Sequence, residues 1–408
     1  MNERSESPSA MATMPGKIRT LLFSTLFPSA SRPGHGTFVE TRLRELLKTG
    51  AIETKVVAPV PWFPLSGARF GEHSKLAATP AFELRNNIEV YHPRYFLPPK
   101  VGMNLAPHTL ARGALPTIRK LIANGFDFDL IDAHYYYPDG VAAGLIAQEL
   151  GKPFIVTSRG SDLNLIADFR YPKKLILKTA GKATASIGVS AALTSRLKEL
   201  GADPSKLLTF RNGVDLERFT PEDRRQSRKK LALPDTKILL SVGNLVELKG
   251  HGIAIAALAE LPEDLHLVIA GTGPERENLQ KLAERLDVIH RVIFAGRIDS
   301  QDLRWWYSAA DALVLCSSRE GLANVLLESL ACGTPVIATP VGGTPEVIAN
   351  NTAGRLMTER SYGALVDAYT RLIADYPDRQ AVRTYAEQFS WQETSTRQVT
   401  LFRETCHA

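Results

Sequence analysis

The segment from residue 312 to residue 346 is the part of the sequence that most restricts the fold. An apolar run, residues 312–316, leads into the polar turn Ser-Ser-Arg-Glu-Gly. We expect a helix to begin near Ala323 and to end at Gly333, because glycine suits the position just past a helix C-terminus. A second apolar run, residues 335–338, follows. This order predicts a unit of parallel sheet whose loop lies at the carboxyl end of the strands, where open α/β sheets bind ligands.

Apolar runs of strand length alternate with helix-length segments along the rest of the chain. We expect strands at residues 18–24, 53–58, 129–132, 154–157, 185–189 and 207–210, and then at 237–242, 265–270, 292–295, 312–316, 335–338 and 354–357. The length of 408 residues suits two domains of about 200 residues each. The predicted class is α/β, with two Rossmann-like, doubly wound domains that face a central cleft.

Two glutamates mark the turn and the helix of the opening segment. Glu320 precedes the helix and Glu328 lies within it, so that helical rise separates them by at most roughly 12 Å. That distance is about the reach from the sugar to the ribose of a nucleotide sugar. The unpaired N–H groups at the helix start, near Gly321, Leu322 and Ala323, favour phosphate between the two carboxylates. On spacing alone, a surface glutamate followed by an ordinary helical glutamate would be the simpler explanation.

The sequence around these glutamates favours the nucleotide-sugar site over two ordinary glutamates. Glu-Gly-Leu-Ala-Asn-Val-Leu-Leu-Glu, with Gly-Thr-Pro-Val and Pro-Val-Gly-Gly-Thr-Pro-Glu after it, resembles the Glu-x7-Glu motif of glycosyltransferase family 4, retaining enzymes of the GT-B fold. One departure is Ala323, where many members have glycine or proline. The resemblance covers nearly all of residues 17–405. It implies an acceptor domain at residues 17–210, a nucleotide-sugar donor domain at 211–388, and a closing helix at 389–408 that returns to the N-terminal domain. Residues 1–16, rich in Ser, Pro and Met, are expected to be a disordered tail.

In the N-terminal half, two positions follow predicted strands. A turn-rich loop, residues 28–36, ends at Gly36, and Thr37 is an expected N-cap for the next helix. The resemblance implies that Gly36 faces the donor diphosphate. His134 stands at the end of another strand, where a lone histidine is more often structural. The resemblance implies an active-site histidine that contacts the donor sugar near the reacting carbon.

The sequence departs from the family pattern at two positions. Many relatives have His-Gly-x-Asp where this chain has Arg159-Gly-Ser-Asp162. Arg159 is a permanent cation, and in one interpretation Arg159 and Asp162 contact the diphosphate or the acceptor. In the other interpretation, Arg159 pairs with Asp162. The family also usually has arginine at the position of Asn244 and lysine at that of Lys249. Lys249 is then the expected counter-charge for the leaving diphosphate. Three arginines are candidates to compensate for Asn244: Arg159, Arg211 and Arg319.

Other expectations concern the base and metals. Ile298, after the strand at residues 292–295, resembles the position that meets the nucleotide base. Gly271-Thr272-Gly273-Pro274 lacks the third glycine of a dinucleotide fingerprint. The family resemblance implies no metal and no cofactor besides the nucleotide-sugar co-substrate, and Asp127-Phe128-Asp129 does not stand in a plausible metal-binding context.

The charge and the surface segments bear on partners. The net charge of +6 suits an anionic substrate or an anionic membrane, but it is too small to argue for nucleic acid. Residues 170–182 alternate cations with Leu and Ile. A half-buried helix with a solvated basic face is the simpler interpretation, and a membrane-facing helix with Lys173, Lys174 and Lys178 is the alternative. The irregular, aromatic segment at residues 59–107 is either a satellite core or an apolar surface for a lipid-linked acceptor.

The compartment follows from cysteines and hydropathy. Three cysteines without metal spacing favour a reducing cytosol. No apolar run approaches the ~18 residues of a membrane helix. Residues 17–30 could mimic a signal peptide, but a first buried strand fits equally well, and we favour the strand because a binding loop follows. The expected location is cytoplasmic, with peripheral contact at the inner face of the cell membrane.

The sequence therefore predicts a retaining glycosyltransferase. It would transfer a sugar from a UDP- or GDP-linked donor to an acceptor, which we expect to be a lipid-linked saccharide of a cell-surface polysaccharide such as an exopolysaccharide. Two alternatives remain: a nucleotide-sugar epimerase on the same fold, and a non-catalytic nucleotide-sugar-binding protein. The base, the donor sugar and the acceptor are not readable from the sequence.

Overall fold

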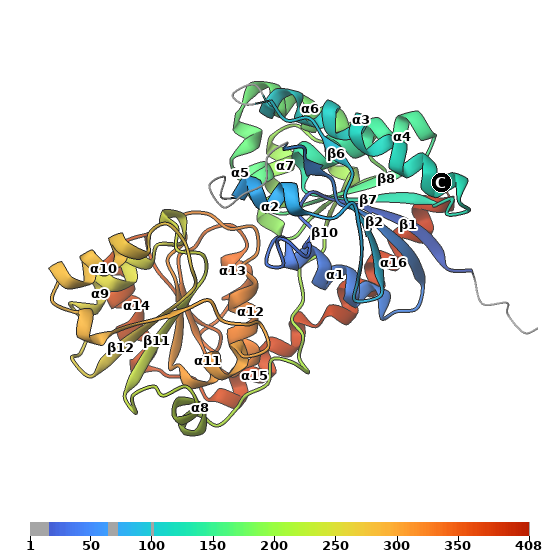
Figure 1. Ribbon diagram of the computed structural model, residues 1–408. Helices are drawn as coiled ribbons and strands as arrows, with labels where there is room; N and C mark the ends of the chain where they lie inside the picture. Colours follow the sequence, from blue (N-terminus) through green and yellow to red (C-terminus); the bar gives the residue numbers. More distant parts are fainter. Residues whose placement is uncertain (1–15, 64–71, 99–101, 408) are drawn as a thin grey trace, which may run out of the picture.

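The computed structural model describes residues 16–63, 72–98 and 102–407, and the predicted tail lies outside them except for Gly16. Two α/β bodies lie side by side (Figure 1). The first sheet comes from residues before 210 and the second from residues after 236. The exact domain boundaries stay a prediction.

Within the described residues, the N-terminal sheet has the strand order β10-β9-β8-β7-β1-β2-β5-β4. Neighbouring strands are parallel except β4 and β5. Its strands are β1 (Ile18–Phe23), β2 (Ile52–Val57), β4 (Phe82–Arg85), β5 (Ile88–Tyr91), β7 (Leu130–His134), β8 (Phe154–Ser158), β9 (Ala185–Gly188) and β10 (Leu207–Thr209); β3 (Val60–Pro61) pairs with β6 (Arg94–Tyr95). Its helices are α1 (Thr37–Leu47), α2 (Glu72–Ala78), α3 (Gly102–Ala123), α4 (Val141–Leu150), α5 (Ser161–Asn164), α6 (Arg170–Lys182) and α7 (Ala191–Glu199).

The C-terminal sheet is parallel throughout, with the order β13-β12-β11-β14-β15-β16 in the described part of the chain. Its strands are β11 (Lys237–Val242), β12 (Leu265–Ala270), β13 (Val292–Gly296), β14 (Ala312–Leu315), β15 (Val336–Ala338) and β16 (Gly354–Leu356). Its helices are α8 (Arg224–Lys230), α9 (His251–Leu258), α10 (Arg276–Arg285), α11 (Leu303–Ala309), α12 (Asn324–Ala331), α13 (Thr344–Val347), α14 (Tyr362–Ala374) and α15 (Arg379–Ala386).

The central strands are apolar along most of their length because helices cover both faces of each sheet. The last helix, α16 (Trp391–His407), runs from the C-terminal body back to the N-terminal one and packs against α1 (Figure 1). The N–H of Val214, in the linker, donates to the carbonyl of Phe389 at 2.8 Å. The chain passes between the two bodies twice, at this linker and before α16, and this hydrogen bond joins the two connecting segments.

Two local predictions were wrong. Residues 59–107 are not irregular throughout, since β4 and β5 form an antiparallel hairpin and α3 begins at Gly102 with Pro107 inside it. In this segment Tyr95 is buried in the core, whereas Phe96 is 58% exposed, and the acceptor surface stays a prediction. Thr37 is not the N-cap of α1, because Gly36 occupies that position in the left-handed region.

Among the described residues, none of the helices has the length and apolar content needed to cross a membrane.

Candidate active site

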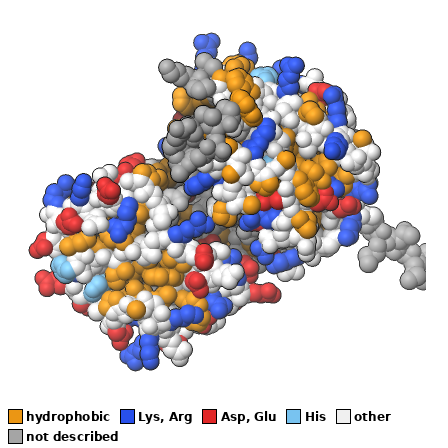
Figure 2. Space-filling view, viewed as in Figure 1, with side chains coloured by type: hydrophobic (Ala, Val, Ile, Leu, Met, Phe, Trp, Pro, Cys, Tyr) orange, Lys and Arg blue, Asp and Glu red, His pale blue; other side chains and the backbone are white. Residues whose placement is uncertain are grey.

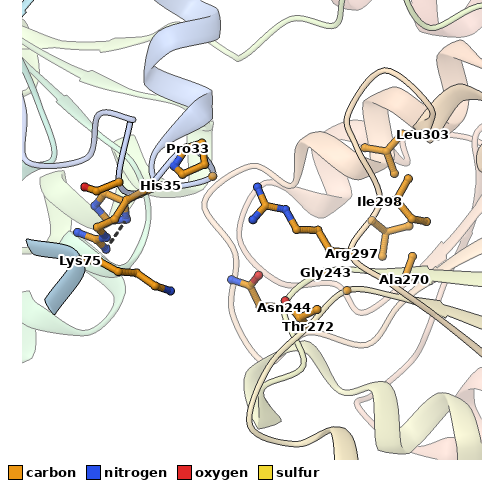
Figure 3. A pocket seen from close by; sticks show the side chains of 15 residues that line it. Pro33, His35, Lys75, Gly243, Asn244, Ala270, Thr272, Arg297, Ile298 and Leu303 are labelled. Atoms are coloured by element: carbon orange, nitrogen blue, oxygen red, sulfur yellow. Dashed lines mark hydrogen bonds between the residues drawn. The ribbon is translucent and has the colours of Figure 1, made fainter. Parts of the chain in front are cut away.

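Two adjoining cavities lie between the two α/β bodies. Figure 2 shows the groove between these bodies. The first cavity, of about 680 Å³, lies at the carboxyl ends of β11 and β12 (Figure 3). The second cavity, of about 520 Å³, lies between the Gly36 loop and the Glu320 turn. Gly34, His35 and Asn244 line both, so the two cavities adjoin at these residues.

The first cavity is cationic on both sides and apolar at one end. Arg32 and Lys75 come from the N-terminal domain and Arg297 from the C-terminal domain, with His35 and Arg297 on opposite sides in Figure 3. Arg32 Nη2 lies 2.9 Å from His35 Nδ1. The apolar end consists of Val242, Ala270, Ile298 and Leu303. This arrangement suits a ligand with a flat apolar part and an anionic part.

Glu320 and Lys249 meet at the edge of the second cavity. Lys249 Nζ lies 2.7 Å from Glu320 Oε1, and Ser317 Oγ donates to the same oxygen at 2.7 Å. The main-chain carbonyl of Glu320 accepts a hydrogen bond from Asn164 Nδ2 of the N-terminal domain at 3.1 Å. The carboxylate is thus fixed by its own domain, and its backbone by the opposite one.

The turn beside Glu320 requires glycine. A Cβ on Gly321 would lie 2.0 Å from the carbonyl oxygen of Arg159, across the interface. Gly36 has φ 69°, and a Cβ there would lie 2.3 Å from the carbonyl oxygen of Leu26. Gly36 and Gly321 both line the second cavity, which brings the two predicted glycines to opposite walls.

Helix α12 begins at Asn324, and Gly333 follows it in the left-handed region, which confirms the predicted ends. Leu322 and Ala323 are buried just before it. Glu328 is half-buried and accepts a hydrogen bond from Tyr307 Oη at 2.7 Å. Burial raises the pKa of Glu328, and the Tyr307 hydrogen bond opposes this.

The carboxylate of Glu328 is oriented toward α11. Glu328 is not among the described residues that line the two cavities. Leu303, one turn before Tyr307 on α11, lines the first cavity. The predicted ribose contact of Glu328 therefore stays a prediction.

His134 is buried behind the cleft wall. Its Nε2 lies 3.2 Å from Asp132 Oδ2, and its Nδ1 contacts the guanidinium of Arg159. Desolvation lowers the pKa of His134 to about 4; Arg159 and Arg42 act in the same direction, whereas Asp132 opposes it. Both ring nitrogens have partners and the side chain is 1% exposed, so the predicted sugar contact of His134 stays a prediction.

Arg159 lines the second cavity, but its guanidinium turns inward. It contacts His134 and donates from Nη1 to Asn212 Oδ1 at 3.2 Å, so it does not pair with Asp162. The carboxylate of Asp162 instead accepts main-chain N–H groups of Tyr136, Arg159 and Gly160 at 2.7–3.1 Å. Asp162 shapes the loop, so the suggested ligand contact is not supported for this carboxylate.

The three arginines proposed to compensate for Asn244 have different surroundings. Arg211 Nε binds Glu346 at 2.7 Å, and Arg159 is engaged as described. Arg319 lines the second cavity next to Glu320. Arg297, in the first cavity beside Asn244, was not considered from the sequence. Asn244 and Ile298 lie in the first cavity, as expected of residues near a nucleotide.

Tyr135 was also missed. It lines the second cavity, has φ 81°, and its hydroxyl lies 2.8 Å from Ser161 Oγ. Strained backbone of this kind persists at functional sites when the surroundings enforce it. The only sequence signal was its position directly after His134 at a strand end.

The described residues contain no group of three or more His, Cys, Asp or Glu side chains placed to hold a metal ion. The three lysines of α6 lie outside the cavities, with Lys174 and Lys178 exposed and Lys173 half-buried.

Comparisons with known proteins agree with this geometry. The model of the family described as Glycosyltransferase Family 4 matches residues 34–218, and that of Glycosyl transferases group 1 matches residues 223–389. The putative teichuronic acid biosynthesis glycosyltransferase TuaC of Bacillus subtilis is 30% identical over 360 residues, which cover 87% of this chain and 89% of that protein. D-inositol 3-phosphate glycosyltransferase 1 of Catenulispora acidiphila is 28% identical, with coverage of 95% and 96%.

Solved structures show the same fold. Sucrose-phosphate synthase from Thermosynechococcus elongatus matches with a TM-score of 0.77 and 20% identity, covering 95% of this chain and 98% of that one. Anabaena HepE in complex with UDP matches with a TM-score of 0.70 and 20% identity, covering 93% and 98%. The two bodies and the cleft between them are those of the GT-B fold. The chain therefore belongs to the family 4 type of glycosyltransferases and is a glycosyltransferase enzyme.

Proposed function

We propose that this enzyme transfers a sugar, with retention, from a UDP- or GDP-linked donor to a saccharide acceptor. The observation that supports this best is the Glu320–Lys249 pair at the edge of a cleft whose first cavity has cations on both sides. The base and ribose would occupy the first cavity near Ile298, and the sugar would extend into the second cavity toward Glu320. HepE, a protein of the same fold, has been solved with UDP-glucose.

In this proposal the chain's own groups supply the charge stabilisation. Lys249 and the N–H groups before α12 would take the negative charge of the leaving diphosphate. Glu320 would hold the sugar hydroxyls, and Glu328, oriented by Tyr307, would hold the ribose. Arg297 and Arg319 would provide the cation that Asn244 does not. No metal is required for these steps.

We propose a lipid-linked saccharide of a surface polysaccharide as the acceptor. TuaC, named for teichuronic acid biosynthesis, supports this class. The surface of the N-terminal domain supports it as well: Phe169 is 48% and Tyr171 42% exposed at the start of α6, next to its lysines. Figure 2 shows Lys and Arg together with hydrophobic side chains on the part of the domain where α3 and α6 lie. Cations beside exposed aromatics favour a surface of anionic lipid.

Donor binding is tested first by thermal shift with UDP, GDP, ADP and their sugars. Stabilisation by one nucleotide and its sugar is expected, and no stabilisation by any would contradict the proposal. Product analysis of the stabilising donor without acceptor then separates the alternatives. Net isomerisation of the donor would indicate an epimerase, and tight binding without transfer to any lipid-linked acceptor would indicate a non-catalytic binder.

The membrane contact is tested by flotation with vesicles of phosphatidylglycerol and phosphatidylcholine. Replacing Lys173, Lys174 and Lys178 by Glu should reduce the bound fraction severalfold, because each lysine near an anionic surface contributes about 1 kcal/mol. The matched control replaces Arg225, Lys229 and Lys230 of α8, in the other domain, by Glu. Equal binding of the α6 variant and the wild type would remove the membrane proposal without affecting the donor site.

A further inference from the structure

A line of buried polar side chains begins at the closing helix. Arg42 of α1 donates from Nε to Gln398 Oε1 of α16 at 2.8 Å. Gln398 Nε2 donates to Asp132 Oδ2 of β7 at 3.2 Å, and the same oxygen faces His134. All four side chains are buried, each at most 2% exposed. Burial of polar groups is costly, and these hydrogen bonds offset part of this cost, although Arg42 Nη2 and Asp132 Oδ1 have no partner among the described residues.

The line continues across the domain interface. Arg159 contacts His134 Nδ1 with Nη2 and donates from Nη1 to Asn212 Oδ1 in the linker. Asn212 Nδ2 then donates to Asn324 Oδ1 at 3.0 Å. Asn324 is the first residue of α12, the helix that begins beside Glu320. Side chains from both domains and the linker thus form one chain of contacts from α16 to α12.

The direction of these hydrogen bonds is fixed by chemistry. A guanidinium only donates and a carboxylate only accepts. His134 must therefore accept at Nδ1 from Arg159 and carry its proton on Nε2, toward Asp132. Asn212 must turn its oxygen to Arg159, which leaves its NH₂ group for Asn324. Protonation of His134 at Nδ1 would break the contact with Arg159, so the ring is held neutral in one tautomer.

Arg159 also meets the donor segment through its backbone. Its carbonyl oxygen packs so closely on Gly321 that a Cβ there would lie at 2.0 Å. Its side chain reaches Asn324 through Asn212. One residue of the N-terminal domain therefore contacts the turn after Glu320 directly and the start of α12 indirectly.

We propose that Arg159 is a positioning residue: with neutral His134 behind it and Asn212 ahead of it, it holds the start of α12 in register with the N-terminal domain. This inference rests on the proposed function only in assigning α12 to the donor. It replaces a direct ligand contact of Arg159 with an indirect role, and it gives His134 a role in support of Arg159.

The first test reads the state of the His134 ring by ¹⁵N NMR of histidine-labelled full-length protein, with His134→Gln to assign the signal. The charged groups facing the ring are Asp132 on β7, Arg159 after β8 and Arg42 on α1. The wild type should show the neutral Nε2–H tautomer without titration between pH 5.5 and 8. Arg159→Gln removes one of the two opposing cations while Asp132 remains, so the pKa of His134 should rise from about 4 by about one unit or more, and a titration of both proteins extended down to about pH 4 measures this rise. A wild-type ring that titrates near pH 6.5, or an unchanged ring in Arg159→Gln, would overturn the proposal.

The second test follows hydrogen exchange of the α12 amides. Asn324→Ala should accelerate exchange in the first turn of α12 about fivefold, because one lost hydrogen bond lowers the free energy of local opening by about 1 kcal/mol. Arg159→Gln should do the same from the other domain, and the double variant should exceed neither single variant by much, because both break one line. Asn324→Asp keeps the acceptor and should restore slow exchange. The matched control is Asn278→Ala, on exposed α10.

Additive effects in the double variant, or no effect of Arg159→Gln on α12, would show that the contacts do not act as a line. Neither test uses a substrate. A negative thermal-shift screen would thus contradict the proposed function alone, and a negative exchange experiment would contradict the positioning role alone.

Discussion

Replacement of Lys249 by Ala is the sharpest test of the site. Its Nζ lies 2.7 Å from Glu320 Oε1, and the side chains are 23% and 11% exposed. At the effective dielectric of such a site, two unit charges about 4 Å apart interact by about 4 kcal/mol. The charge that develops on a leaving diphosphate would meet Lys249 in these surroundings. Removing one preorganised contact of this kind costs about 3–4 kcal/mol in the transition state, so we expect kcat to fall by about 10²–10³-fold.

The same change should have little effect on folding. An ion pair that is partly exposed contributes about 1 kcal/mol or less to stability, so the Tm should move by no more than about 2–4 °C. Glu320→Ala should lose activity to a similar degree. The matched control is Lys229→Ala on α8, which should keep both activity and Tm.

The assay measures release of nucleoside diphosphate from the donor identified by thermal shift, at saturating acceptor, together with a melting curve for each variant. If Lys249→Ala and Glu320→Ala both transfer at the wild-type rate, the site has been assigned wrongly. A loss of activity accompanied by an equal loss in Lys229→Ala would point to general destabilisation and would also contradict the reasoning.

The remaining predictions concern orientation, close packing, pH and metals. Tyr307→Phe removes the hydroxyl that orients Glu328, so calorimetry should show about fivefold weaker donor binding; an unchanged Kd would exclude the ribose contact. Gly321→Ala places a Cβ against the Arg159 carbonyl, so transfer should fall at least about tenfold, and full activity would refute the close approach. Burial raises the pKa of Asp139 to about 7, although the hydrogen bonds that its carboxylate accepts act in the opposite direction. The folded protein therefore keeps a proton on Asp139 at pH values above about 4, where the unfolded chain has released it. Stability in urea should therefore fall as the pH rises from 4 to 7, by about 4 kcal/mol at most, and Asp139→Asn should flatten this slope; equal slopes would contradict it. Excess EDTA should leave the transfer rate unchanged, and a loss restored by a divalent ion would show a metal requirement.

Much of the architecture was readable from the sequence because it depends on local patterns. The alternation of apolar runs with helical segments predicted the parallel C-terminal sheet and six of the strands of the N-terminal sheet, but not the β4–β5 hairpin, and Gly333 fixed the end of α12. The motif that includes Glu320 predicted the turn, and Lys249 followed a predicted strand; the fold brings the two side chains into contact, although 71 residues separate them. Strand ends in a parallel sheet meet at one edge, so such residues converge without knowledge of the packing.

The tertiary structure alone decided what each side chain faces. The sequence placed His134 at a strand end, but only the packing of α16 and Arg159 around it buries the ring and occupies both nitrogens. The line from Arg159 to Asn324 joins residues of two domains through the linker. Tyr307 came to Glu328 from a separate helix. Hydrogen bonds between such distant segments depend on how helices pack and on which neighbour satisfies each buried group, and no periodicity in the chain encodes that choice.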